Sequence, residues 1–409
     1  MIRPLSWYLI NRSGRLLKES TGLTYGNTMI ASVRECCYLG ITFTLNGALN
    51  PAQLQLKQKG LLRGYFSLKS LVDIRPLKRS VVFKLFDSLM LPIASYGCQV
   101  WFTETWLVKN LTENATGSLL KSSAKDPIER IHLSFLKWNL GVGSKTSNAA
   151  VWGDTGRHPL LVKVSKQVFS FFERVESMAT NNADCLVKYA FNEQKNLNMS
   201  WYRRLTQLKD ILQSHSETRL NYPSQLRARL MGDFQDAWQR EKLNNRKLVF
   251  YNSIKSSFEA EKYIDANLSH KDLKRLAQLR TSSHKYSIET GRYGSKHGNV
   301  LNRICDFCST EDKEVLDLLK ECPFFEPVIE DEWHILNICP RYTDARNQLK
   351  AKTLELLKSS ASMPHIFTDN SLIKDLARFS KKCHSIKFPD DVPKEKEQKT
   401  TPPQHPRDS

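Results

Sequence analysis

One stretch decides the C-terminal part of the fold, Ile304–Tyr342, which reads "ICDFCSTEDKEVLDLLKECPFFEPVIEDEWHILNICPRY". It holds a C-x2-C pair, Cys305 and Cys308, and, after 25 intervening residues, an H-x4-C pair, His334 and Cys339. A C-x2-C turn directs two thiolates at one ion, and H-x4-C presents a second pair from a short turn or helix start. The spacing predicts a zinc site, and its role is structural because four protein ligands leave no open coordination position.

A fifth candidate ligand, Cys322, lies inside the interval, which is longer than a compact zinc knuckle needs. We favour His334 because it forms a local pair with Cys339, whereas Cys322 stands beside Pro323 with no partner at ligand spacing. Two unrelated buried thiol pairs are the alternative to a metal site. Acidic residues beside His334 either orient its imidazole or occupy the first turn of a helix; they are Glu330, Asp331 and Glu332.

Length and cysteine usage indicate an intracellular protein of two or three domains. The chain has 409 residues and is 40% hydrophobic, enough to bury a sizeable core. Its nine cysteines are an odd number spread over a long chain, unlike a disulfide framework. We predict no secretion signal and no membrane helix, since no apolar run approaches roughly 20 residues. A reducing compartment follows, either nucleus or cytoplasm.

The charge favours a polyanionic partner. Lysine and arginine number 61 against 42 acidic residues, a net charge of +19, and phosphate backbones bind such surfaces by counterion release. Cations and aromatic rings alternate around the metal motif, as a reader of RNA or single-stranded DNA requires. The alternative is a solvated basic surface with inward-facing rings. The predicted nucleic-acid-binding residues are Arg280, Arg292, Lys296, Arg303, Trp333, Arg341 and Tyr342.

Hydrophobic periodicity predicts a mainly α fold. Leu226, Leu230, Phe234 and Trp238 recur every four residues, which is typical of a core-facing helix, and Ser269 is predicted to cap a further helix. The predicted organisation is a β-hairpin region (1–50), a helical thumb-like region (51–111), a linker (112–127), a connecting helical domain (128–280), a zinc-knuckle-like module with a closing helix (281–360) and a mostly disordered tail (361–409).

Five segments, in order, resemble one family. They are "YLGITFTLNG" (Tyr38–Gly47), "LMLPIASYGCQVW" (Leu89–Trp101), "IERIHLSFLKWNLGVGSKTSNAAVWGDTGRHPL" (Ile128–Leu160), "IETGRY" (Ile288–Tyr293) and "EDEWHILNICPRYTDAR" (Glu330–Arg346). Together they resemble the C-terminal half of the reverse transcriptase of jockey-like, LINE-type (non-LTR) retrotransposons. The resemblance implies a primer-grip-like hairpin at Tyr38, Leu39 and Gly40, a helical thumb, and Cys/His residues that bind zinc and template RNA or target DNA. It also implies work in the nucleus.

The segment before Tyr38 departs from that family. Two-metal phosphoryl transfer needs convergent carboxylates, which the family carries upstream of the Tyr-Leu-Gly segment, yet the first 37 residues contain no aspartate. "FPDD" (Phe388–Asp391) matches the aromatic-x-Asp-Asp pattern by letter only, beside prolines that no central strand accepts. We therefore expect no catalytic residues and no catalytic magnesium site in this chain.

The expected function is nucleic-acid binding by a C-terminal fragment of a retrotransposon reverse transcriptase. Two alternatives remain. The chain is part of an active RNA-directed DNA polymerase whose palm comes from another chain or a longer product, or it is a helical interaction scaffold that zinc staples.

Overall fold

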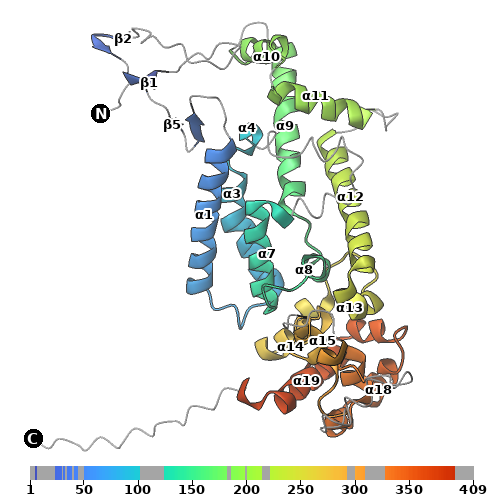
Figure 1. Cartoon of the computed structure of the whole chain (residues 1–409). Helices are drawn as coiled ribbons and strands as arrows, with labels where there is room; N and C mark the ends of the chain where they lie inside the picture. Colours follow the sequence, from blue (N-terminus) through green and yellow to red (C-terminus); the bar gives the residue numbers. More distant parts are fainter. Residues whose placement is uncertain are drawn as a thin grey trace, which may run out of the picture. The chain divides into compact units, whose positions relative to one another are not determined.

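The computed structural model describes residues 5–6, 24–29, 31–32, 35–38, 41–44, 50–101, 124–181, 186–198, 200–213, 222–292, 300–308 and 328–391. The chain divides into two compact units. Unit 1 comprises Met1–Asn267 and Arg280–Ser283, and unit 2 comprises Leu268–Leu279 and His284–Ser409. The described part is mainly helical, as predicted from the sequence (Figure 1).

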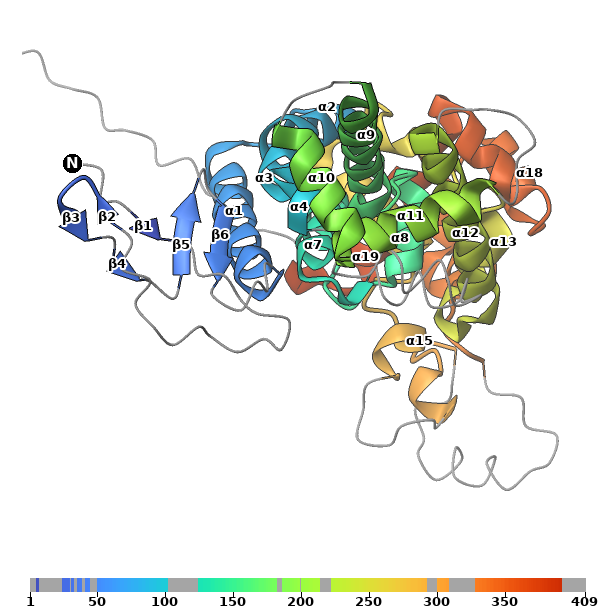
Figure 2. The ribbon, with the colours of Figure 1, turned by 90° about the horizontal axis from the view of Figure 1, so that it is seen from above.

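Short strands form the described N-terminal part of unit 1 (Figure 2). Strands β5 and β6 pair antiparallel, with Tyr38 opposite Ile41, so Tyr38 ends a strand; Leu39 and Gly40 lie outside the described residues. The strands are β1 (Leu5–Ser6), β2 (Thr24–Tyr25), β3 (Thr28–Met29), β4 (Ala31–Ser32), β5 (Glu35–Tyr38) and β6 (Ile41–Thr44).

Helices follow for the rest of unit 1. The first group is α1 (Asn50–Leu71), α2 (Arg79–Leu85), the π-turn η1 (Phe86–Met90), α3 (Leu91–Ser95) and α4 (Cys98–Trp101). The second group is α7 (Pro127–Leu140), α8 (Asn148–Thr155), α9 (Leu160–Asn181), α10 (Leu186–Asn196), α11 (Ser200–Gln213), α12 (Tyr222–Asn244), η3 (Arg246–Leu248), α13 (Val249–Ile254) and η4 (Lys262–Ile264). Helices α4, α10 and α12 each pack against α9.

Helix α7 shows how local sequence sets the ends of a helix. The carboxylate of Asp126 accepts hydrogen bonds from the backbone N–H groups of Ile128 (2.8 Å) and Glu129 (2.9 Å). Pro127 takes the first helical position, where its missing N–H leaves no bond unmade. Gly141 follows the last turn at φ 70°, a left-handed conformation that glycine adopts without steric cost.

Aromatic side chains form the core of unit 1. Phe234 and Trp238, from the predicted α12 stripe, are buried together with Leu226 and Leu230, so the prediction of a core-facing helix is confirmed. Trp152 of α8 meets Phe234 edge to face at 5.3 Å, and the Trp238 indole donates to the Ala149 carbonyl at 2.9 Å. Large buried rings with satisfied polar atoms contribute most of the burial energy of such a core.

A buried ion pair lies where α8 ends. Asp154 and Arg280 are both 0% exposed, and the Asp154 carboxylate accepts from Arg280 Nε (3.2 Å), Arg280 Nη2 (3.1 Å) and the Tyr263 hydroxyl (2.7 Å). The prediction that Arg280 contacts nucleic acid is therefore wrong. Two residues further on, Gly156 has φ +60°, and a Cβ there would lie 2.4 Å from the backbone nitrogen of Ala260. Only glycine fits that close approach.

Unit 2 consists of short helices and turns. The Ser269 hydroxyl accepts from the backbone N–H of Asp272 at 3.1 Å, so the predicted cap is confirmed. The elements are α14 (His270–Arg280, whose last residue belongs to unit 1), α15 (Ser287–Thr290), η5 (Val300–Arg303), the π-turn η6 (His334–Ile338), η7 (Pro340–Tyr342), α17 (Thr343–Arg346), α18 (Ala351–Leu357), η8 (Met363–Thr368), α19 (Asn370–Lys387) and η9 (Pro389–Asp391).

Helix α19 corrects the predicted disordered tail. The boundary at 361 was too early because the polar, proline-rich composition begins only near Asp390, after an amphipathic segment. Asp369 caps α19 by accepting from the Ser371 (2.7 Å) and Leu372 (3.3 Å) N–H groups. The helix buries Leu372, Ile373, Leu376, Ala377, Phe379 and Cys383. Residues 392–409 lie outside the described part of the chain.

The "FPDD" motif ends this helical segment. Asp391 accepts from Lys285 Nζ at 2.7 Å and lies 3.1 Å from His384 Nε2, while the Phe388 ring lies 5.8 Å from the ring of Tyr286. Asp391 is thus held in ion pairs within unit 2.

Candidate metal centre

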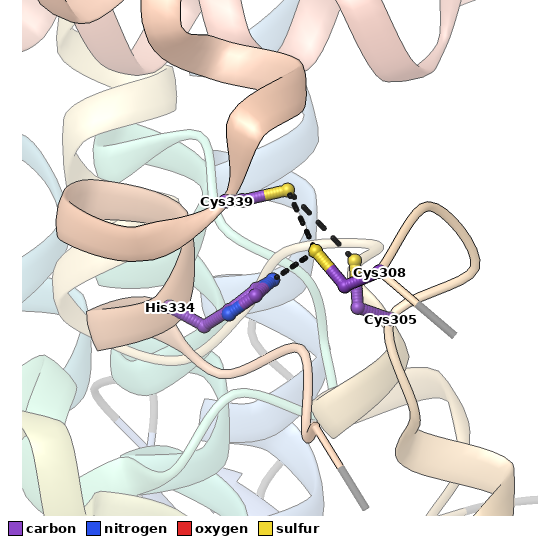
Figure 3. Close-up of side chains that lie close together, drawn as sticks. All are labelled: Cys305, Cys308, His334 and Cys339. Atoms are coloured by element: carbon purple, nitrogen blue, oxygen red, sulfur yellow. Dashed lines mark hydrogen bonds between the residues drawn. The ribbon is translucent and has the colours of Figure 1, made fainter. Parts of the chain in front are cut away.

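The predicted ligands Cys305, Cys308, His334 and Cys339 converge in unit 2 (Figure 3). Their ligand atoms all lie within 4.8 Å of one another. Cys339 Sγ is 3.8 Å from both Cys305 Sγ and Cys308 Sγ, and Cys308 Sγ is 3.4 Å from His334 Nε2. The prediction that these four side chains meet is confirmed. We call them the Cys3His cluster; Cys322 lies outside the described residues.

The spacing of the cluster fits a tetrahedral ion. With bonds of about 2.3 Å to sulfur and 2.0–2.1 Å to nitrogen, the edges of a zinc tetrahedron are about 3.8 Å between sulfurs and 3.5 Å between sulfur and nitrogen. The measured separations of 3.8 Å and 3.4 Å match those edges. The cluster could therefore hold zinc through three sulfurs and His334 Nε2.

A β-bridge explains why a long interval between the ligand pairs does no harm. Ile304 pairs antiparallel with Ile329, the Cys305 N–H donates to the Val328 carbonyl at 2.9 Å, and the Glu330 N–H donates to the Arg303 carbonyl at 2.8 Å. The two ligand-bearing segments, which residues 309–327 separate in the sequence, therefore lie next to each other in space. The geometry of the cluster depends on the bridge and not on the number of intervening residues.

A π-turn brings His334 and Cys339 to one side. Residues five apart in an α-helix point about 140° away from each other. In η6 the Cys339 N–H instead donates to the His334 carbonyl at 2.8 Å, and this i to i+5 closure places the two residues over one another. The turn begins where Asp331 Oδ1 accepts from the His334 N–H at 2.7 Å.

The three acids beside His334 have defined partners. Asp331 accepts from the His334 backbone, which supports the interpretation of a residue in the first helical turn. The Glu330 carboxylate accepts from the Ser287 N–H at 2.7 Å and pairs with Lys387. Glu332 lies 3.0 Å from His284 Nε2. These acids brace the chain around the cluster.

Burial shifts the pKa values of Cys308, Cys339 and His334 in the direction that favours their neutral forms. Desolvation, reinforced by the neighbouring thiols, raises the pKa of Cys308 to about 12, and burial also raises the pKa of Cys339. Burial lowers the pKa of the His334 imidazole. A divalent cation would displace thiol protons on binding, because the thiolate is the form of cysteine that binds metal.

Arg346 fixes the carbonyl end of the ligand-bearing turn. Its Nε donates to the Leu336 carbonyl at 2.9 Å and its Nη2 to the Cys339 carbonyl at 3.0 Å. Residues that orient metal ligands typically account for 10- to 100-fold in metal affinity. We expect Arg346→Ala to weaken zinc binding about tenfold, measured by competition with a chromophoric chelator.

The control is Arg378→Ala, which removes an exposed arginine from α19. Equal zinc affinity for the Arg346 and Arg378 variants would show that the carbonyl contacts of Arg346 do not position Cys339.

The structure divides the predicted nucleic-acid-binding residues. Tyr342 is 0% exposed, so its predicted contact with nucleic acid is wrong. Arg303 and Trp333 are half-buried, and Arg292 pairs with Glu289 at 3.4 Å. Lys296 lies outside the described residues.

Arg341 and Phe307 lie together at the rim of the cluster, with the Arg341 side chain 20% exposed. Arg341 binds Asp306 through Nη1 (3.0 Å) and Nη2 (3.2 Å), and its guanidinium lies 5.1 Å from the centroid of the Phe307 ring. Phe307 is 52% exposed. Sequence reasoning missed Phe307, whose position between the two cysteines of the C-x2-C pair was the signal that placed it beside the metal ligands.

Comparisons of the chain with protein-family models, with curated proteins and with solved structures found no match. None of the helices that the structure describes is long and apolar enough to cross a membrane.

Proposed function

We propose that unit 2 is a zinc-ordered module that binds RNA or single-stranded DNA. The observation that carries the proposal is the Cys3His cluster with Phe307 and Arg341 at its rim. Zinc would hold the two ligand-bearing segments together in a structural role, since the protein fills all four positions. Phe307 offers a ring face to an unpaired base, and Arg341 offers a cation to a neighbouring phosphate.

We further propose that the chain derives from the C-terminal half of a LINE-type retrotransposon reverse transcriptase. The ordered motifs support this origin, and the cluster forms at the Cys and His positions that the resemblance marks as ligands. Nucleic-acid binding is then the activity of this chain, and target DNA in the nucleus is one of its ligands.

Binding to a short single-stranded RNA tests the proposed function. The affinity of the zinc-loaded protein is expected to fall steeply with salt, because each phosphate contact releases counterions. Phe307→Ala is expected to weaken binding about tenfold through lost stacking. Arg341→Ala is expected to lower the slope of log affinity against log salt by about 0.7, the value for one phosphate contact on a single strand. Fluorescence anisotropy titrations at several salt concentrations measure all three.

Lys358→Ala is the matched control, since it removes an exposed lysine of unit 2 outside both ligand-bearing segments. If the protein binds no RNA at any salt concentration, the proposal is contradicted and a helical interaction scaffold that zinc staples is favoured. RNA-directed DNA synthesis after addition of a separate palm-containing chain would instead favour a subunit of an active polymerase.

A further inference from the structure

A hollow of about 920 Å³ opens in unit 1, where the turn between α3 and α4 faces α9. Its walls include Tyr96, Gln99, Lys166, Ser170, Phe171 and Arg174, and we call it the α9 groove. The groove shares no residue with the Cys3His cluster, which belongs to unit 2.

One wall of the groove carries two cations and a hydroxyl group in a row. Lys166, Ser170 and Arg174 follow each other at intervals of four on α9, so they lie along one side of the helix. The two cations are separated by about 12 Å along the axis, enough to span several phosphates at roughly 3.4 Å per nucleotide of a stacked strand. No acid lines the groove, and no carboxylate among the described residues pairs with Lys166 or Arg174.

The groove also contains aromatic rings and amides. Tyr96 is 50% exposed. The Arg174 guanidinium lies over the Phe171 ring, 5.4 Å from the ring centroid. Gly97 has φ +66° and turns the chain from α3 into α4 directly after Tyr96. The Gln99 carbonyl accepts from the Trp201 indole at 2.8 Å, which holds this wall in place.

We propose that the α9 groove binds one strand of nucleic acid, with phosphates on Lys166 and Arg174 and an unpaired base on Tyr96. Cations in a row fit a polyanion of regular charge spacing, and an exposed ring fits a base that has lost its pairing partner. A duplex would present no base face to Tyr96. The inference goes beyond the proposed function, because the α9 groove lies in unit 1 and needs no metal.

The test uses the full-length zinc-loaded protein and a fluorescein-labelled uridine oligonucleotide. Lys166→Ala/Arg174→Ala is expected to lower the slope of log affinity against log salt by about 1.4, twice the 0.7 of a single contact. Lys69→Ala/Lys195→Ala removes two exposed lysines of unit 1 outside the groove and is expected to keep the wild-type slope. A wild-type slope for the groove variant would overturn the proposal.

Tyr96→Ala separates base stacking from charge. It is expected to weaken oligouridine binding about tenfold with no change in slope, while Tyr96→Phe retains the affinity. A polyglutamate peptide of matched charge that competes as well as oligouridine would show a protein partner and overturn the proposal. The two sites are tested separately, since Phe307→Ala reports on unit 2. If Phe307→Ala weakens oligouridine binding and Tyr96→Ala does not, the groove proposal alone is contradicted. If Tyr96→Ala weakens binding and Phe307→Ala does not, the proposal for the metal module alone is contradicted.

Discussion

Replacing Asp154 with asparagine is expected to lower the free energy of unfolding of unit 1 by about 3 kcal/mol, the lower end of the usual cost of breaking a buried ion pair, because Glu261 still lies 3.2 Å from Arg280 Nη2. Asp154 and Arg280 are both inaccessible to water. Burial lowers the pKa of Arg280, but Asp154 and Glu261 more than offset this, so its pKa is raised overall and the guanidinium stays charged. Urea unfolding followed by fluorescence of the buried Trp152 and Trp238 measures the loss.

A second substitution tests whether the loss comes from breaking the pair between Asp154 and Arg280. In Asp154→Asn/Arg280→Met the amide can still accept from the Tyr263 hydroxyl, and no buried cation lacks a partner. We therefore expect the double variant to be more stable than Asp154→Asn. Asp73→Asn, at an exposed pair with Arg75, is the matched control and should cost less than about 1 kcal/mol. If Asp154→Asn costs no more than Asp73→Asn, the buried pair does not hold unit 1 together.

Local patterns were the part of this fold that sequence could predict. The α12 stripe, the Ser269 cap and the two Cys/His pairs each depend on residues within a few positions, where chain geometry fixes the spacing. The convergence of the two Cys/His pairs could be expected because four ligands of one tetrahedral site have few other arrangements.

Long-range partners were the part that sequence could not predict. Arg280 looked like a phosphate-binding residue, but its partner Asp154 stands 126 positions earlier in the chain. Tyr342 looked like a base-stacking ring, yet it is buried between elements of unit 2. The bridge between Ile304 and Ile329 and the π-turn at His334–Ile338, which together shape the cluster, leave no periodic pattern in the sequence.

Cys305→Ser is expected to abolish near-stoichiometric zinc binding. Structural zinc sites contribute apparent binding free energies of about 10–16 kcal/mol, and removing one of four ligands forfeits a share of several kcal/mol, roughly 100-fold or more in affinity. Cys305 is also held by the bridge, since its N–H donates to the Val328 carbonyl at 2.9 Å. The measurements are metal content after dialysis against a chelator and protease resistance of unit 2.

Cys383→Ser separates the loss of a ligand from the loss of a buried thiol. Cys383 is 0% exposed and lies in the same unit, but it is not one of the four clustered ligands. Its replacement should cost some stability and keep one zinc per chain. Chelation of the wild-type protein should expose unit 2 to protease while the urea transition of unit 1 persists, because the core around Asp154 and Arg280 contains no metal ligand. If the wild-type protein contains no metal, or if Cys305→Ser keeps its metal, zinc at this cluster does not hold the two ligand-bearing segments together.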